Sequence, residues 1–290
     1  MLLPCYPDFV PISIDLNDDM HRLLSQTIDG VSEYTFANLY LFRGRYNYRV
    51  SCTQDKALIL SGERDGKKFF ATPCALPEKN VLDELFALHD YWKGIPDSIY
   101  LPNREQLEAW GIEIVEDRDN FDYLYLRTDL AELSGKKYHK KRNLVNQYVI
   151  SYVHHETPLT PELVPHALAV LDHWREDKGE EGDYAACREV LGLFDRFPMN
   201  GALYYINNRP VGWCLGESLA GGSMFAIHFE KALDRYKGIY QFINQHFASS
   251  LPEQYTYINR EQDLGDEGLR QAKMTYRPAG FVRKYIGRKG

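Results

Sequence analysis

Residues 201–230 read GALYYINNRPVGWCLGESLAGGSMFAIHFE, and this pattern is the strongest indication of the fold. Three stretches in it are rich in apolar and aromatic residues and are expected to be strands: 201–206, 210–218 and 223–229. Runs of Asn and Gly separate them, which predicts an antiparallel meander. The apolar spacing downstream predicts a helix over 240–251, a strand over 255–259, a helix over 267–276 and a strand over 281–285. We therefore expect a mixed, mainly antiparallel sheet flanked by helices.

The first half of the chain predicts a comparable order of elements. Helices are expected over 15–29, 81–92 and 103–110, and strands over 46–50, 57–61, 68–72, 98–101 and 121–127. Asp65-Gly66, between two of these strands, is a strong hairpin signal. A basic helix over 136–148 begins the second half. The expected fold class is therefore α/β, with two domains at residues 1–134 and 135–290.

The composition is that of a folded protein, because 44% of the 290 residues are hydrophobic and 26% are charged. This balance excludes an intrinsically disordered chain. No apolar run reaches 18 residues, so no transmembrane segment is predicted, and the first ten residues lack the features of a signal peptide. The five cysteines are far apart and form no Cys-x-x-Cys pair. Free thiols in a cytoplasmic protein, with peripheral membrane contact left open, are the expectation.

Charge is distributed unevenly along the chain. The net charge is −7, to which residues 1–134 contribute −10 and residues 135–290 contribute +3. An acidic protein is a poor general binder of nucleic acid, but a local basic site in the second half stays open.

Three strings in the second half form the most specific pattern. They are Ser134-Gly-Lys-Lys-Tyr-His-Lys-Lys-Arg-Asn143, Arg235-Tyr-Lys-Gly-Ile-Tyr240, and Asn259-Arg-Glu-Gln-Asp-Leu-Gly265 with GLRQAKMTYRP at 268–278. With the element order, they resemble the acetyltransferase-like (GNAT) superfamily. Within it, they resemble a bacterial family similar to the C-terminal domain of phosphatidylglycerol lysyltransferase, and more distantly the Fem-type aminoacyltransferases.

The resemblance implies two tandem acetyltransferase-like domains, the first degenerate and the second with the active cleft. It also implies transfer of an acyl or aminoacyl group from acyl-coenzyme A or aminoacyl-tRNA, with no obligatory cofactor beyond that donor. The acceptor stays open, because an amine or hydroxyl of a small molecule, a lipid head group or a peptide is compatible with the resemblance. A non-catalytic ligand- or protein-binding module on a degenerate form of this fold is the alternative.

The resemblance also places donor binding at the start of the helix over 240–251. In such folds the pyrophosphate of the donor lies on a helix N-terminus, where free N–H groups and the helix dipole favour an anion. Arg235, Lys237 and Gly238 occupy the matching loop and are expected to bind the donor. The bulky Tyr240 departs from the small residue of the family pattern, which weakens the case for coenzyme A. An ordinary glycine near a helix start is the alternative.

Two residues are candidates for acid–base chemistry. Glu230 ends a strand that would line the cleft, so it could take a proton from the attacking group; the alternative is an acid that supports a helix start. His228 is a second candidate base on the same strand. By resemblance, Tyr276 could protonate the leaving group, although packing in the core is the simpler role for it.

Polar residues leave the strand over 255–259 together. Asn259, Glu261 and Asp263 alternate, so a strand that continued that far would aim them to one side. Carboxylates and an amide are natural acceptors for an ammonium, which makes Asn259 and Asp263 candidates for binding the donor amino acid. A helix cap or turn at Asp263 is the alternative.

The basic cluster at 136–142 is a candidate phosphate site. On a helix, Lys137, Lys140 and Lys141 share one face, with Arg142 beside them. They could hold the phosphates of a tRNA or of an anionic lipid head group. A solvated helix face, or one docked on the acidic first half, is the alternative. No metal site is expected, because His154 and His155 are adjacent and would point to opposite faces of a strand.

Overall fold

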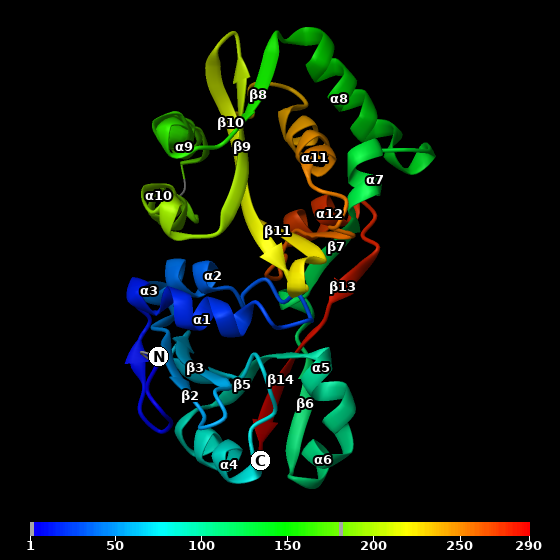
Figure 1. The fold of residues 1–290 in the computed structure, drawn as a ribbon. Coiled ribbons are helices and arrows are strands. Elements are labelled where there is room, and N and C mark those ends of the chain that lie inside the picture. Colours follow the sequence, from blue (N-terminus) through cyan, green and yellow to red (C-terminus); the bar gives the residue numbers. More distant parts are fainter. Residues whose placement is uncertain (1–2, 180–181) are drawn as a thin grey trace.

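The computed structural model describes residues 3–179 and 182–290. In this part of the chain, fourteen strands form two seven-stranded sheets, one in each lobe of the elongated molecule (Figure 1). Two pairs are parallel, β4 (Lys67–Ala71) with β5 (Tyr91–Pro96) and β11 (Met224–Ala232) with β12 (Tyr257–Asn259). The other strand pairs are antiparallel. Two mixed, mainly antiparallel sheets flanked by helices were expected, and the structure confirms them.

The first lobe contains a sheet covered by short helices. Its remaining strands are β1 Val10–Pro11, β2 Arg49–Cys52, β3 Leu58–Arg64, β6 Ile112–Glu116 and β14 Lys284–Lys289, in the order β1-β2-β3-β4-β5-β14-β6. Its helices are α1 Asn17–Leu24, α2 Phe36–Leu41, α3 Arg43–Tyr46, α4 Lys79–Leu88, α5 Asp97–Tyr100 and α6 Arg104–Ala109. Asp65 and Gly66 both have positive φ and form the predicted hairpin turn between β3 and β4.

The helix expected over 15–29 is shorter than predicted. A 3-10 turn, Ile14–Leu16, precedes α1, and α1 itself ends at Leu24. The Thr27 hydroxyl donates a hydrogen bond of 2.8 Å to the backbone carbonyl of Leu24. Thr and Ser side chains compete in this way for backbone groups, which ends the helix early.

The second lobe contains the other sheet, with helices on both faces. Its remaining strands are β7 Asp122–Leu126, β8 His154–Pro158, β9 Met199–Ile206, β10 Arg209–Leu219 and β13 Gly280–Val282, in the order β13-β7-β12-β11-β10-β9-β8. Its helices are α7 Arg127–Glu132, α8 His139–Ser151, α9 Val164–Lys178, α10 Tyr184–Gly192, α11 Ile239–Ser250 and α12 Glu267–Met274. In Figure 1, α9 and α10 lie on one side of β9 and β10, and α11 and α8 lie on the other.

Each sheet contains one strand from the other half of the chain. β7 precedes residue 134 but lies in the second sheet, and β14 ends the chain but lies in the first. The strand expected over 281–285 is therefore wrong as a single element. It is broken at Arg283, where the chain passes from β13 in one sheet to β14 in the other. The division of the chain at residue 134 stays a prediction.

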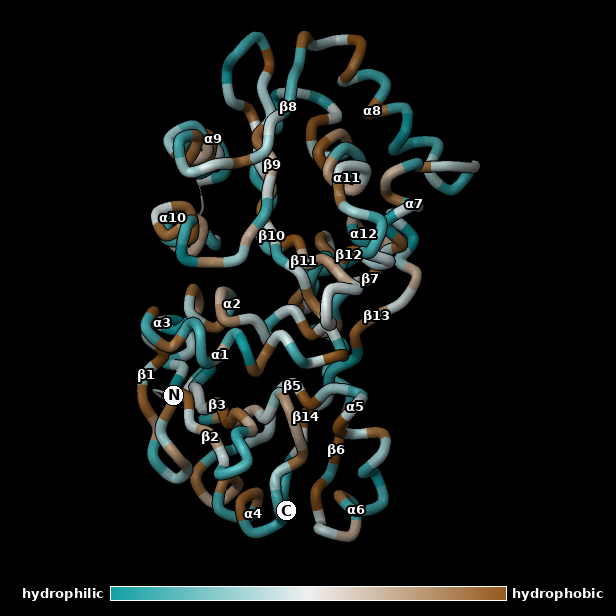
Figure 2. Tube along the Cα trace, in the orientation of Figure 1, coloured by the Kyte–Doolittle hydropathy of each residue, from teal (hydrophilic) through white to brown (hydrophobic). Residues whose placement is uncertain are grey.

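A buried ion pair joins the two lobes. Lys284 on β14 is 0% exposed, and its ammonium donates to the carboxylates of Asp122 on β7 (2.7 Å) and of Glu33. Burial alone would lower the pKa of Lys284, but these two carboxylates raise it above its ordinary value. This ion pair thus joins the two sheets. In the second sheet it lies on β7, which neighbours the central strands β12 and β11. Figure 2 shows apolar residues concentrated along those strands, whereas α8 is largely hydrophilic.

Candidate functional site

The central strands β11 and β12 part from one another. They pair only at Met224 with Tyr257, Phe225 with Ile258, and Ala226 with Asn259. β12 ends there, while β11 continues to Ala232. The two strands therefore splay at their C-terminal ends. Parted strands leave backbone groups without their ladder partners, so a gap of this kind is suited to a polar ligand.

A cavity of about 290 Å³ lies at this gap, and we call it the strand-gap cavity. Its walls come from β7, β11, the segment after β12, and α12 with the residues that follow it. The lining residues are Tyr125, Ile227, His228, Glu230, Lys231, Arg260, Glu261, Leu269, Ala272, Lys273 and Tyr276. The two residues expected to act in catalysis, Glu230 and Tyr276, are thus brought to one cavity.

Glu230 is already paired in this cavity. Its carboxylate accepts a hydrogen bond of 2.9 Å from the guanidinium of Arg260. Burial lowers the pKa of Arg260, but the Glu230 carboxylate and neighbouring tyrosines raise it overall. The sequence analysis did not single out Arg260, although it lies within the quoted string at 259–265. The pair fixes the position of the carboxylate at the point where the strands diverge.

Lys273 on α12 is the functional candidate that the sequence analysis missed. Its ammonium donates to the backbone carbonyl oxygens of Arg260 and of Glu261, the latter at 3.1 Å. Burial lowers the pKa of Lys273 to about 8, so its charge is sensitive to pH just above neutrality. The signal was present, because Lys273 and Tyr276 are three residues apart and side chains at that spacing share a helix face.

Tyr276 closes one side of the cavity and meets the basic helix. Burial raises its pKa to about 12, so the hydroxyl keeps its proton at neutral pH. The Lys141 ammonium lies 3.9 Å from the centre of the Tyr276 ring. Burial and the charge of Arg260 lower the pKa of Lys141. One member of the basic cluster therefore reaches the edge of the site.

His228 is a buried cation and does not fit the expected role of a base. Its Nδ1 lies 2.7 Å from Glu261 and its Nε2 lies 3.0 Å from Glu217. Burial lowers the pKa of His228, but the two carboxylates outweigh that effect and raise it to about 10. An imidazolium at neutral pH has both nitrogens protonated and cannot accept a proton. The expectation of a base was wrong because it took no account of Glu217 on the neighbouring strand.

Asn259 lies outside the strand-gap cavity. Its side chain is fully buried and donates to the backbone carbonyl of Gly30 (2.8 Å) and to Asp122 (3.1 Å). The side-chain oxygen accepts from the backbone N–H of Glu261 at 2.7 Å. These bonds connect Asn259 to the lobe interface rather than to a ligand.

Asp263 is also buried away from the cavity. Its carboxylate accepts bonds from Arg270 (2.7 Å) and Tyr123 (2.5 Å). These donors hold its pKa well below the usual range even though burial opposes ionisation. The expectation that Asn259 and Asp263 bind the donor amino acid needs correction, because neither lines the cavity that contains Glu230. The chain turns at Glu261 and Leu264, which both have positive φ, so strand alternation does not extend past Asn259.

The predicted donor loop lies at the start of α11, and none of its three residues lines the strand-gap cavity. Arg235 and Lys237 are exposed, and Gly238 occupies the N-cap position with φ of 91°. A Cβ at Gly238 would lie 2.3 Å from the backbone oxygen of Leu144 on α8. Helix α8 therefore packs against the first turn of α11. The Tyr240 hydroxyl donates to the carbonyl of Ala232 at 3.0 Å, so it is also bound within the protein.

The remaining members of the basic cluster do not share one free face. Lys137 pairs with Asp129 at 2.7 Å, and Arg142 donates to the carbonyl oxygens of Leu133 and Gly135. Lys140 is exposed. Binding of phosphates by this cluster stays a prediction, with Lys140 and Lys141 as the members best placed for it.

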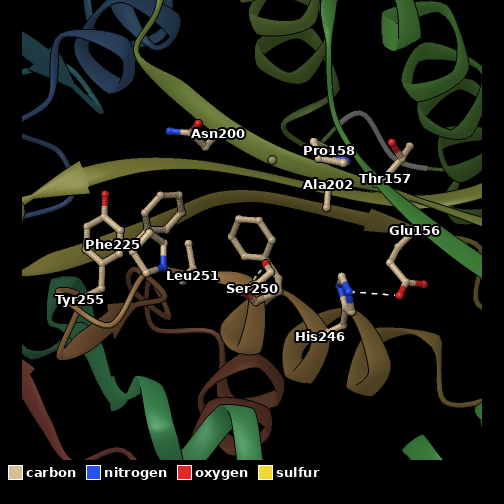
Figure 3. A pocket seen from close by; sticks show the side chains of 13 residues that line it. Glu156, Thr157, Pro158, Asn200, Ala202, Phe225, His246, Ser250, Leu251 and Tyr255 are labelled. Carbon is tan, nitrogen blue, oxygen red and sulfur yellow. Dashed lines mark hydrogen bonds and ion pairs between the residues drawn. The ribbon is translucent and has the colours of Figure 1, made fainter.

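Two further cavities lie in the described part of the molecule. In a cavity of about 540 Å³ beside α11, the His246 imidazole lies 3.2 Å from the Glu156 carboxylate, and Phe225 is among the apolar residues of the wall (Figure 3). No residue predicted for the site lines it. Another, of about 530 Å³, lies between the lobes and shares His228, Glu261, Leu269 and Lys273 with the strand-gap cavity. We call it the interlobe cavity.

Two features are absent from residues 3–179 and 182–290. No group of three or more His, Cys, Asp or Glu side chains there is arranged to hold a metal ion. None of the helices described combines the length and apolar character needed to cross a bilayer.

Comparison with known proteins places the chain in a family. The family model described as phosphatidylglycerol lysyltransferase, C-terminal, matches residues 26–288. The chain therefore belongs to the family of phosphatidylglycerol lysyltransferase C-terminal domains. The sequence-based assignment to this family is confirmed.

Solved structures agree with this result. A conserved protein of unknown function from Bacteroides thetaiotaomicron is 30% identical, with a TM-score of 0.87 over 97% of this chain and 99% of that one. The L-PGS structure from Bacillus licheniformis is 14% identical, with a TM-score of 0.66 over 100% of this chain and 94% of that one. The latter shows a shared fold, with the same two-sheet architecture over the whole chain.

A curated relative matches only in part. An uncharacterised protein from Mycoplasmoides gallisepticum is 23% identical over 185 residues, which are 61% of this chain. The match spans 58% of the length of that relative.

Proposed function

We propose that the protein is an aminoacyltransferase, or more broadly an acyltransferase, whose reaction takes place in the strand-gap cavity. The observation that carries this proposal is the parting of β11 and β12 around a cavity that contains Glu230, Lys273 and Tyr276. A carboxylate can accept a proton and a phenol can donate one, and an ammonium can stabilise negative charge, so these groups suit acyl transfer to an amine or hydroxyl. Membership of the lysyltransferase family supports the same class of reaction.

Each of the three side chains has a distinct part in the proposed reaction. Glu230 takes the proton from the attacking amine or hydroxyl. The Lys273 ammonium has three N–H donors, of which two serve backbone carbonyls, and the third stabilises the oxyanion that forms on the acyl carbon. Tyr276 gives its proton to the departing oxygen. Glu230 then loses its proton to solvent, and Tyr276 takes up a proton from solvent, which restores both side chains.

The contacts of α11 favour aminoacyl-tRNA over acyl-coenzyme A as donor. A pyrophosphate at the first turn of this helix would need free N–H groups. There the backbone oxygen of Leu144 faces Gly238, and an oxygen acceptor repels an anion. The Tyr240 hydroxyl is bonded within the protein beside the same turn. A tRNA donor implies a cytoplasmic protein, as the five free cysteines also suggest.

A transfer assay with purified protein tests the proposal. Lysyl-tRNA, alanyl-tRNA and acetyl-coenzyme A are each offered with phosphatidylglycerol vesicles or with a dipeptide, and products are identified by mass spectrometry. We expect an aminoacylated product from one of the charged tRNAs and none from acetyl-coenzyme A. The absence of product and of thermal stabilisation by every donor would favour the non-catalytic binding module.

A further inference from the structure

The interlobe cavity contains a buried cation without a partner. Lys93 on β5 is 8% exposed and lines this cavity. Among residues 3–179 and 182–290, its ammonium has no hydrogen-bond acceptor and no carboxylate within ion-pair distance. Its described contacts are with the ring faces of Tyr46 and Phe69, each 5.0 Å from the ammonium. Burial accordingly lowers the pKa of Lys93.

The nearest acidic groups are already bound elsewhere. Glu33, which attracts Lys93 electrostatically, is hydrogen-bonded to Lys284. Asp117 accepts a bond of 2.8 Å from Asn120. A buried ammonium is costly unless an anion pairs with it. A ligand that supplies the missing negative charge would therefore gain affinity at this position.

We propose that the interlobe cavity binds the acceptor through an anionic oxygen group, a carboxylate or a phosphate, that pairs with Lys93. Tyr48 lines the same cavity, and its hydroxyl has no hydrogen-bond partner in the described structure, so it is available as a second donor. A volume of about 530 Å³ is typical of small-molecule sites. This inference rests on the proposed transfer reaction.

The positions of the two cavities fix how the bound acceptor would be oriented. Lys93 and Tyr48 belong to the first lobe, whereas the residues that both cavities share belong to the second. In Figure 1, this boundary runs between α2 and α3 on one side and β11 on the other. An acceptor whose anion meets Lys93 can extend its amine or hydroxyl past Lys273 into the strand-gap cavity. Lys93 is thus a specificity residue that selects anionic acceptors without taking part in the chemistry.

Binding of two matched ligand pairs tests this inference. Glycerol 3-phosphate is compared with glycerol, and N-acetylglycine with N-acetylglycinamide, by titration calorimetry. At least one anion should bind about 10-fold more tightly than its neutral counterpart, a difference of about 1.4 kcal/mol. The pair with the larger ratio identifies phosphate or carboxylate as the preferred group. The ratio should fall to about 1 in Lys93→Met and stay unchanged in Lys67→Met, which alters an exposed lysine on β4.

A second measurement covers the case in which Lys93→Met does not fold. In the wild-type protein, NMR titration of the lysine side chains should show the pKa of Lys93 rising when the preferred anion is added. Equal affinity for charged and neutral ligands, or a preference that survives in Lys93→Met, would overturn the inference. So would binding to phosphatidylglycerol vesicles with no binding of either soluble anion. Because these tests measure binding, their outcome is independent of whether transfer is detected.

Discussion

The Glu230 carboxylate and the Arg260 guanidinium form an ion pair of 2.9 Å at the point where β11 and β12 diverge. Both residues line the strand-gap cavity, so a ligand there would contact this pair. Arg260 thereby positions the carboxylate without any contribution from the first lobe. The proposed chemistry depends on this arrangement together with Lys273 and Tyr276.

The charge state of Lys273 predicts the pH dependence of transfer. Its pKa of about 8 means that the ammonium loses its proton as pH rises through 8. If the ammonium stabilises the oxyanion, the single-turnover rate should fall above pH 8, and Lys273→Met should lower the rate at pH 7 and abolish that fall. A rate that instead rises through pH 8 in the wild type would identify Lys273 as a base and contradict the role assigned to it.

The ion pair between Lys284 and Asp122 predicts a large effect on stability. Replacing Lys284 by Met leaves two carboxylates buried without their cation, which should lower the free energy of unfolding by about 3–5 kcal/mol. Urea denaturation at pH 7 measures this change. Lys289→Met on the same strand is the control, because its partner Asp83 is at the surface and the effect should be much smaller. Equal effects of the two substitutions would show that the buried pair does not join the lobes.

The basic helix predicts a specific dependence of tRNA binding on salt. Lys140 is exposed and Lys141 reaches the edge of the strand-gap cavity, so these two are the members of the cluster best placed to meet phosphates. Their joint replacement by Ala should weaken binding of charged tRNA and reduce the slope of log affinity against log salt by about 1 for each phosphate that the helix no longer binds. Lys67→Ala with Lys68→Ala, in the other lobe, is the matched control. An unchanged slope in the helix variant would remove α8 from the tRNA site.

Local sequence patterns were sufficient for many of the elements and for part of the site. They were wrong over 98–101, where the expected strand is the short helix α5, and over 81–92, where α4 ends at Leu88 and β5 begins at Tyr91. Apolar strands and turn residues predicted the meander over 201–229, and the resemblance to the acetyltransferase-like fold implied the cleft in which Glu230 and Tyr276 lie. Patterns of this kind depend on neighbouring residues, so they could not show that β7 and β14 each join the other half's sheet.

The errors in the site have the same physical origin. Asn259 and Asp263 turn inward because positive φ at Glu261 ends the alternation, and the residue types at these positions do not indicate that turn. The charge of His228 depends on Glu217, which lies on the next strand. The spacing between Lys273 and Tyr276 indicates a shared helix face, but the low pKa of Lys273 results from tertiary burial, which spacing does not indicate.

The most direct test of the account is the single-turnover rate of aminoacyl transfer by Glu230→Gln. Glutamine keeps the shape of the side chain and removes the base, so the rate should fall by about 100- to 10,000-fold while donor affinity changes little. Glu253→Gln, at an exposed position after α11, should retain the wild-type rate. If Glu230→Gln transfers as fast as the wild type, the strand-gap cavity is not where the proposed proton transfer takes place.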